Sequence, residues 1–138
     1  MASTSDVDRA CTLVREYRLD EAESQFQALA NDLSLSREDR ADCYQMLGVI
    51  VEIDPSRGRG DDVGLFYYRK ALELVPDHLW ASYAIATTYG SSGARHEDFS
   101  IFQTAMKNLE RRKAELDAKS LRFVVEKARE TNQPFSME

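Results

Sequence analysis

The 138-residue sequence contains few of the residues that interrupt or cross-link a chain, with three prolines, six glycines and two cysteines. So little Pro and Gly excludes a collagen-like or low-complexity chain, and 43% hydrophobic residues exclude a wholly disordered one. Cys11 and Cys43 are too few for a disulfide framework and lack CxxC spacing, so we expect two reduced, partly buried thiols. The length suits one domain with one core.

Long apolar runs and an excess of positive charge are missing as well. The longest apolar run, Met46–Val51, is far shorter than the roughly 20 residues of a membrane span. The first residues contain no basic segment followed by an apolar stretch, so we expect no secretory signal and a cytoplasmic protein. The net charge of −6 opposes binding to nucleic-acid phosphates and to anionic lipid, and we therefore expect neither partner.

Catalytic and metal-binding motifs are not found in the sequence. The two histidines, His78 and His96, lie apart near expected helix starts and lack the spacing of zinc ligands, so we expect them to be exposed or to cap helices. We expect Gly90–Gly93 to be a turn between helices and not a phosphate loop, because no Walker or dinucleotide-binding pattern surrounds it. The sequence therefore predicts a protein that is not an enzyme and that holds no cofactor or metal.

What the sequence does contain is helical periodicity, with apolar residues recurring every three or four positions. Capping signals mark the helix starts, among them Ser5, the box Asp20–Glu23 and Ser36. We expect Pro55–Gly60 to be a flexible loop that folding does not need, and the tail 132–138 to be disordered or loosely docked. These patterns predict an all-α chain of seven helices, at about 6–17, 20–33, 37–53, 62–75, 78–90, 96–112 and 115–131.

Two segments of the chain repeat each other. Phe66–Ala71 aligns with Ser100–Ala105, which places Tyr68 over Phe102 and Ala71 over Ala105, each pair 34 residues apart. Upstream, the segment 44–51 aligns with 82–89, which places Leu47 over Ile85 and Gly48 over Ala86. The first pair of segments is offset by 34 residues and the second by 38, and a repeat length in this range is typical of helical repeat proteins.

The repeat resembles the tetratricopeptide repeat, a 34-residue helix–turn–helix with a W-x2-L-G-x2-Y, A-x3-F and P pattern. The segment Gly64–Pro76 carries the strongest likeness, and a weaker first copy includes Ala10, Ala22 and Phe26. The resemblance implies a right-handed α-solenoid of antiparallel helix pairs in a single domain, 1–138. Its parts would be repeats at about 6–33, 37–76 and 78–112, a capping helix at about 115–131 and the tail 132–138.

The resemblance also assigns roles to small and large residues. Gly48, Ala86, Ala10 and Ala22 would lie where two helices approach closely. Tyr68, Phe102 and Phe26 would be wedged between neighbouring repeats. The sequence departs from the pattern at Gly64 and at Asp98, where the family has small apolar residues such as alanine. The last helix carries Leu116, Phe123, Val124 and Ala128 on one stripe, which predicts a cap with one apolar face.

In this family the first helix of each repeat lines a concave groove that binds a partner peptide. The resemblance therefore implies that the middle repeat supplies Asp42, Gln45, Val49 and Glu52 and that the third supplies Trp80, Tyr83 and Thr87. Val7, Cys11 and Val14 would follow from the first repeat. The Lys, Arg and Asn residues with which relatives clamp the carboxylate terminus of heat-shock chaperones are missing from these positions. We expect instead a segment with apolar anchors and basic flanks.

The leading functional hypothesis is thus a protein-interaction module of the adaptor or co-chaperone kind. The first alternative is a scaffold subunit that associates with itself, for example as a homodimer. A second alternative is a secretion-type chaperone that holds a substrate segment in the groove. The groove could also be filled by the chain's own tail, with Phe135 as the plug.

Overall fold

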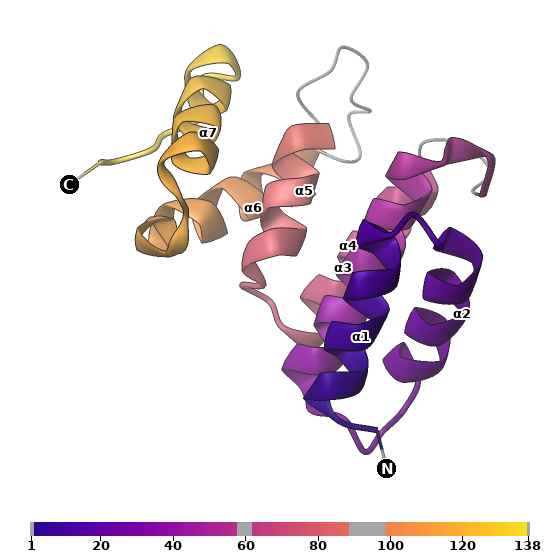
Figure 1. The fold of residues 1–138 in the computed structure, drawn as a ribbon. Helices are drawn as coiled ribbons and strands as arrows, with labels where there is room; N and C mark the ends of the chain where they lie inside the picture. Colours follow the sequence, from indigo (N-terminus) through magenta and orange to yellow (C-terminus); the bar gives the residue numbers. More distant parts are fainter. Residues whose placement is uncertain (1, 58–61, 89–98, 138) are drawn as a thin grey trace. The chain divides into compact units, whose positions relative to one another are not determined.

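The computed structural model describes residues 2–57, 62–88 and 99–137, and this part of the chain is all-helical. The seven predicted helices all occur, and the third has the predicted bounds. Two short 3₁₀ turns accompany them (Figure 1). The elements are α1 Thr4–Arg15, α2 Leu19–Ala30, α3 Arg37–Ile53, η1 Pro55–Arg57, α4 Asp62–Leu74, α5 Leu79–Thr88, α6 Phe99–Arg111, η3 Lys113–Glu115 and α7 Ala118–Glu130.

The chain divides into two compact units, Met1–His78 and Leu79–Glu138. The division falls where the sequence places the boundary between the second and third repeats. Each unit is described separately below, and the single domain expected from the sequence stays a prediction. Among the described helices, none has the length and apolar character needed to cross a membrane.

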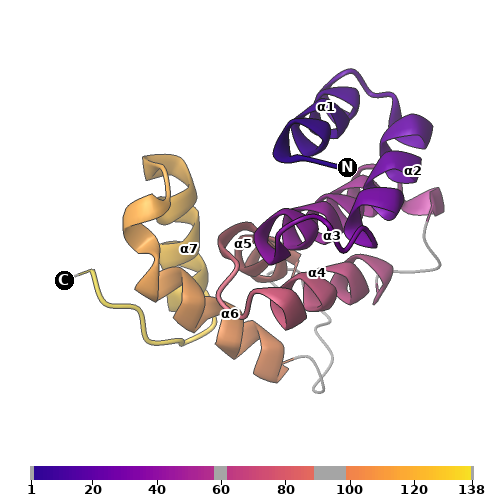
Figure 2. The same ribbon diagram turned by 90° about the horizontal axis from the view of Figure 1, so that it is seen from below.

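In unit 1, residues 1–78, each helix packs against the next one along the chain, and α1 also contacts α3. Figures 1 and 2 show α3 and α4 running side by side, which is the most extensive of these contacts. Ala10, Ala22 and Phe26 are completely buried, as their predicted places between helices require. The resulting core joins Val7, Ala10, Leu19, Ala22, Phe26, Leu29, Ala30, Leu35, Cys43, Leu47 and Ile50.

The first two helices begin at other residues than the sequence predicts. The start of α1 is capped by Ser3 and not by Ser5, and the backbone N–H of Ser3 donates to the Asp6 carboxylate at 2.8 Å. The prediction of a capping box at Asp20 is wrong, because α2 begins at Leu19 and has Arg18 as its N-cap. Tyr17, with a φ of 60°, turns the chain there in the left-handed region that favours glycine.

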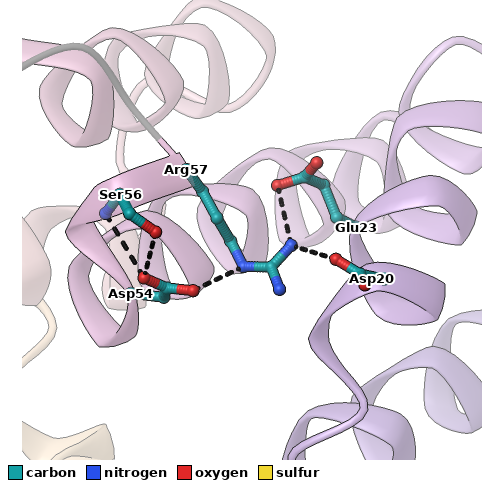
Figure 3. Close-up of polar contacts among 5 residues, drawn as sticks. All are labelled: Asp20, Glu23, Asp54, Ser56 and Arg57. Carbon is teal, nitrogen blue, oxygen red and sulfur yellow. Dashed lines mark hydrogen bonds and ion pairs between the residues drawn. The ribbon is translucent and has the colours of Figure 1, made fainter.

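The prediction of a flexible loop at Pro55–Gly60 is wrong for its first three residues, which form η1. From η1 the Arg57 guanidinium reaches Asp54 at 3.1 Å and, on α2, Asp20 at 2.7 Å and Glu23 at 3.9 Å (Figure 3). The hydroxyl of Ser56 donates to Asp54 at 2.6 Å. This side of the connection is therefore tied to α2, while residues 58–60 lie outside the described part.

In unit 2, residues 79–138, α5 packs against α6, and α7 contacts both. A buried polar pair links the first two helices, because the Asn108 side-chain amide donates to the Ser82 hydroxyl at 3.1 Å. The last helix starts at its cap Asp117, whose carboxylate accepts from the Ser120 N–H at 2.7 Å. Its apolar stripe is confirmed for Val124 and Ala128, which are buried, whereas Phe123 is only partly covered. Leu116 is buried as well, but it lies before α7 in extended backbone, so its predicted place on the last helix is wrong.

The tail after α7 lies against unit 2. The N–H of Gln133 donates to the Ala128 carbonyl at 2.8 Å, and the N–H of Ser136 donates to the Glu110 carboxylate at 2.7 Å. The Lys113 ammonium donates to the Ser136 carbonyl and lies 6.0 Å from the centre of the Phe135 ring. The tail is thus docked through a few exposed contacts on α6 and η3.

Candidate functional site

The predicted groove residues of the middle repeat all lie on α3 in unit 1. Asp42, Gln45 and Val49 are partly exposed and Glu52 is exposed. The Asp42 carboxylate lies 2.6 Å from Nε2 of His78, and His78 itself is only 6% exposed. The expectation of an exposed His78 is therefore wrong, and its buried imidazole has the polar partner that it needs in Asp42.

Glu52 lies against α4 on one side. Its Cγ is 3.7 Å from the place that a Cβ on Gly64 would take. Burial, followed by the nearby charge of Glu52, raises the pKa of the Tyr68 phenol far above its ordinary value. Asp42 thus contacts His78, and Glu52 lies close to Tyr68 and Gly64. Both carboxylates interact with other residues of unit 1 and do not only form an acidic border of a groove.

The residues predicted from the first repeat face the core of unit 1. Val7 is 4% exposed and belongs to the core, so it cannot line a binding surface. Cys11 and Val14 pack against the same core and are partly covered. Burial raises the pKa of the Cys11 thiol. The assignment of Val7 to the groove is wrong, because the same helix face that the repeat register selects is used to pack α1 into the unit.

The third-repeat residues lie on α5 in unit 2, and two of them are in contact. Trp80 is 42% exposed, and its ring meets that of Tyr83 edge-on with centroids 5.7 Å apart. Thr87 is partly exposed, and its hydroxyl donates to the Ala84 carbonyl one turn back. The helix therefore presents an aromatic pair followed by a hydroxyl that is already bonded.

A third ring from another helix extends the pair. Phe123 of α7 lies 6.0 Å from Tyr83, with the ring planes tilted by 57°. The Lys127 ammonium lies 5.3 Å from the Phe123 centroid and 3.5 Å from a Glu130 oxygen. We call Trp80, Tyr83 and Phe123 the aromatic row. It joins two helices that are separated by a whole helix in the sequence.

Sequence reasoning missed Phe123 as a member of this surface, since its spacing fits the apolar stripe of the last helix equally well. Lys127 could have indicated this place for Phe123 in the sequence. A lysine one helical turn after a phenylalanine can bring its charge close to the ring, which is typical of a ring near the surface. Trp80 and Tyr83 were found because the repeat register had left them without a core role.

No group of three or more His, Cys, Asp or Glu side chains that could hold a metal gathers in residues 2–57, 62–88 and 99–137. His96 and the turn predicted at Gly90–Gly93 lie outside these residues. No family model, curated protein or solved structure matches the chain.

Proposed function

We propose that the chain is a protein-interaction module that binds a segment of a partner protein on the aromatic row of unit 2. The observation that carries this proposal is the packing of Trp80, Tyr83 and Phe123 into one row, with Trp80 42% exposed at its end. The indole of Trp80 therefore contacts a neighbouring ring and is still partly open to water. Trp and Tyr at such positions are the residues that most often dominate binding energy at interfaces.

The tetratricopeptide type of repeat is part of this proposal. Tyr68 and Phe102, which the sequence aligns, are both almost completely buried, and each lies on the second helix of a sequential pair. Gly48 and Ala86, also aligned, are both buried on the first helix of a pair. These positions support a repeated helix pair in which small residues allow close approach and rings fill the space beyond.

The row suits an apolar anchor of the partner for a physical reason. Trp80 is held by Tyr83, and Tyr83 is held by Phe123, so these side chains have little conformational freedom to lose on binding. An aliphatic or aromatic side chain of the partner would cover the exposed part of the Trp80 indole. The apolar surface of both groups would then be removed from water.

The experiment selects a partner by chemistry, with a random peptide library displayed against the immobilised full-length protein. The selected peptides should carry an apolar residue at a fixed position and should shift the emission of Trp80, the single tryptophan. The affinity of the variant Trp80→Ala, measured by calorimetry, should fall by about 30-fold, which corresponds to roughly 2 kcal/mol.

A matched control uses Phe66 on α4, an aromatic residue that is 54% exposed in unit 1. Phe66→Ala removes a similar exposed ring and should leave the affinity within about twofold. If the selected peptides bind Trp80→Ala and the parent protein equally well, the aromatic row is not the binding surface. If Phe66→Ala weakens binding as much as Trp80→Ala does, general apolar exposure explains the selection and the proposal fails.

A further inference from the structure

A hollow of about 520 Å³ lies between α1 and α2 in unit 1, whereas the aromatic row belongs to unit 2. It is lined by Asp6, Arg9 and Leu13 of α1 and by Glu16, which caps the end of α1, and these residues share one helix face because they are three or four residues apart. Val7 and Ala10, which pack into the core, lie on a different face of the same helix. The hollow is therefore a feature of the surface that this helix pair leaves uncovered.

The floor of the hollow is apolar. Leu13 of α1 is partly buried, Leu29 of α2 is almost completely buried, and Ala28 of α2 is exposed at its edge. Ala28 has only a methyl group, so the space above it is open. An apolar side chain entering this space would be shielded on two sides by helices, which is the geometry in which burial of apolar surface is effective.

The negative charge of the chain is concentrated in unit 1, the unit that contains the hollow. Unit 1 holds nine Lys and Arg against sixteen Asp and Glu, a net charge of −7, whereas unit 2 holds nine against eight, a net charge of +1. At the hollow itself Asp6 pairs with Arg9 at 2.5 Å, and Glu16 lies 4.0 Å from Arg18, which does not line the hollow. The field at this surface favours a cationic partner.

We propose that this hollow docks an amphipathic helix of a partner protein that carries Lys or Arg beside its apolar face. A furrow between two adjacent helices is complementary in shape to a third helix, whose ridges of side chains fit between the two. Asp6 and Glu16 are ten residues apart, which is about 15 Å along α1 and matches three turns of a docked helix. Cations near its two ends would meet these carboxylates, and its apolar residues would meet Leu13, Ala28 and Leu29.

The test uses a synthetic helical peptide of 18 residues with Leu at helical spacing and Lys elsewhere. A second peptide, in which every Lys is replaced by Glu, is used for comparison. Amide signals of the full-length protein are followed by NMR during titration. The Lys peptide should shift the signals of residues 12, 13, 25 and 28, and the Glu peptide should not. The variant Ala28→Arg fills the hollow with a cation at an exposed position and should weaken binding at least tenfold.

The matched control is Gln27→Arg, which adds the same charge at an exposed neighbour that does not line the hollow. It should retain binding within about threefold. Equal loss in both variants, or signal changes spread over unit 1, would mean attraction by charge without a site and would overturn the proposal. Equal binding of the Glu peptide would overturn the choice of a basic partner. Self-association of the protein that Ala28→Arg abolishes would identify a second copy as the occupant and would also overturn it.

Discussion

The ring of Tyr68 lies directly on the backbone of Gly48, so that a Cβ added at residue 48 would be 2.4 Å from Cε1 and 2.7 Å from Cζ of the tyrosine. Real Cβ atoms do not approach ring carbons so closely. The contact joins α3 to α4, the pair of helices that packs most extensively in the described part of unit 1. Glycine is required here for space and not for backbone conformation, because the residue is in the middle of a helix.

We predict that Gly48→Ala destabilises the protein, because overpacking a filled core usually costs about 1–3 kcal/mol. The roughly 1 kcal/mol that alanine gains over glycine inside a helix offsets part of this cost and leaves a net loss of up to about 2 kcal/mol. Urea denaturation monitored by circular dichroism measures the difference. The double variant with Tyr68→Phe should be no more stable, because the colliding atoms are ring carbons and not the hydroxyl.

Gly64 on α4 provides the control for this prediction. A Cβ there would meet Glu52 Cγ at 3.7 Å and the Gly48 carbonyl oxygen at 3.8 Å, which are ordinary contacts. Gly64→Ala should therefore stabilise the protein by up to about 1 kcal/mol through helix propensity alone. The two glycine-to-alanine substitutions would then change the free energy of unfolding in opposite directions. If both are stabilising, the close approach of Tyr68 to Gly48 is wrong.

Much of the helical framework follows from the sequence, because capping chemistry is local. Ser36 accepts from the Asp39 N–H at 3.1 Å, and α3 begins after it as its S-x-x-D pattern predicts. The start of α2 could not be obtained in the same way. It depends on the positive φ of Tyr17. A glycine or asparagine at this position would have indicated a positive φ, but a tyrosine does not.

The predicted site was accessible to sequence reasoning only in part, for a similar reason. Spacing along one helix correctly places Trp80 and Tyr83 on one face, because residues three apart on a helix are neighbours. Spacing cannot show that His78 returns to Asp42, 36 residues earlier, or that Phe123 joins Tyr83 from a distant helix. Both contacts depend on how helices pack, and the free energy that selects the packing is spread over the whole core.

The two cysteines should differ sharply in reactivity. Cys43 is completely buried, and burial together with the charge of Asp42 raises the pKa of its thiol to about 12. Cys11 is partly exposed, with its pKa raised to a smaller degree by burial. At pH 8 iodoacetamide should therefore label Cys11 first, and Cys43 only when unit 1 opens. Mass spectrometry of digested samples separates the two rates.

The same burial gives an alkaline pH dependence of stability. The folded protein holds the Cys43 proton up to a pH of about 12, whereas the unfolded chain loses it near the ordinary value of 9.0. Stability should thus be unaffected below pH 9 and should fall as the pH rises from there toward 12. Cys43→Ala should show a shallower fall over this interval. Equal labelling rates for Cys11 and Cys43 at pH 8 would contradict the burial on which both expectations depend.

Arg57 should make the connection between α3 and α4 sensitive to salt. Arg57→Met keeps most of the side-chain packing but removes the ion pairs to Asp20, Glu23 and Asp54. We expect a lower melting temperature than that of the parent protein at low ionic strength and a smaller difference in 1 M NaCl, where exposed charges are screened. A difference that salt does not change would assign the effect of Arg57 to packing alone.

Low pH should also remove the difference in stability between Arg57→Met and the parent protein. Hydrogen bonds from Ser56, together with the nearby Arg57 charge, lower the pKa of Asp54 below its ordinary value of 3.8. For a lowered pKa the contribution to stability is present above the ordinary value and is lost as the pH falls through the folded-state value. Arg57→Met and the parent protein should therefore converge in stability as the pH falls below 3.8 and through the folded-state pKa of Asp54. Scanning calorimetry between pH 7 and pH 2.5 checks this.

The last helix should protect unit 2 from association. Leu116, Val124 and Ala128 are buried, and α7 contacts both α5 and α6, so a chain that ends after Arg112 exposes the sides of these two helices. It also leaves Tyr83 without its contact to Phe123. Because exposed apolar patches drive association, we expect this truncated chain to form oligomers whose mass rises with concentration in light scattering. The helices of unit 1 should remain folded, with their amides protected from hydrogen exchange.

A shorter truncation after Gln133 separates the role of α7 from that of the tail. It removes Phe135 and Met137, an exposed residue, but keeps the hydrogen bond from the Gln133 N–H to Ala128 that closes the helix. The tail is attached mainly by exposed contacts to Glu110 and Lys113, so its loss should leave the mass and the melting temperature nearly unchanged. If the chain ending at Arg112 keeps the mass that the parent chain has at high concentration, α7 is not a cap. If the chain ending at Gln133 already associates, the protecting element is the tail, and Phe135 covers apolar surface that α7 leaves open.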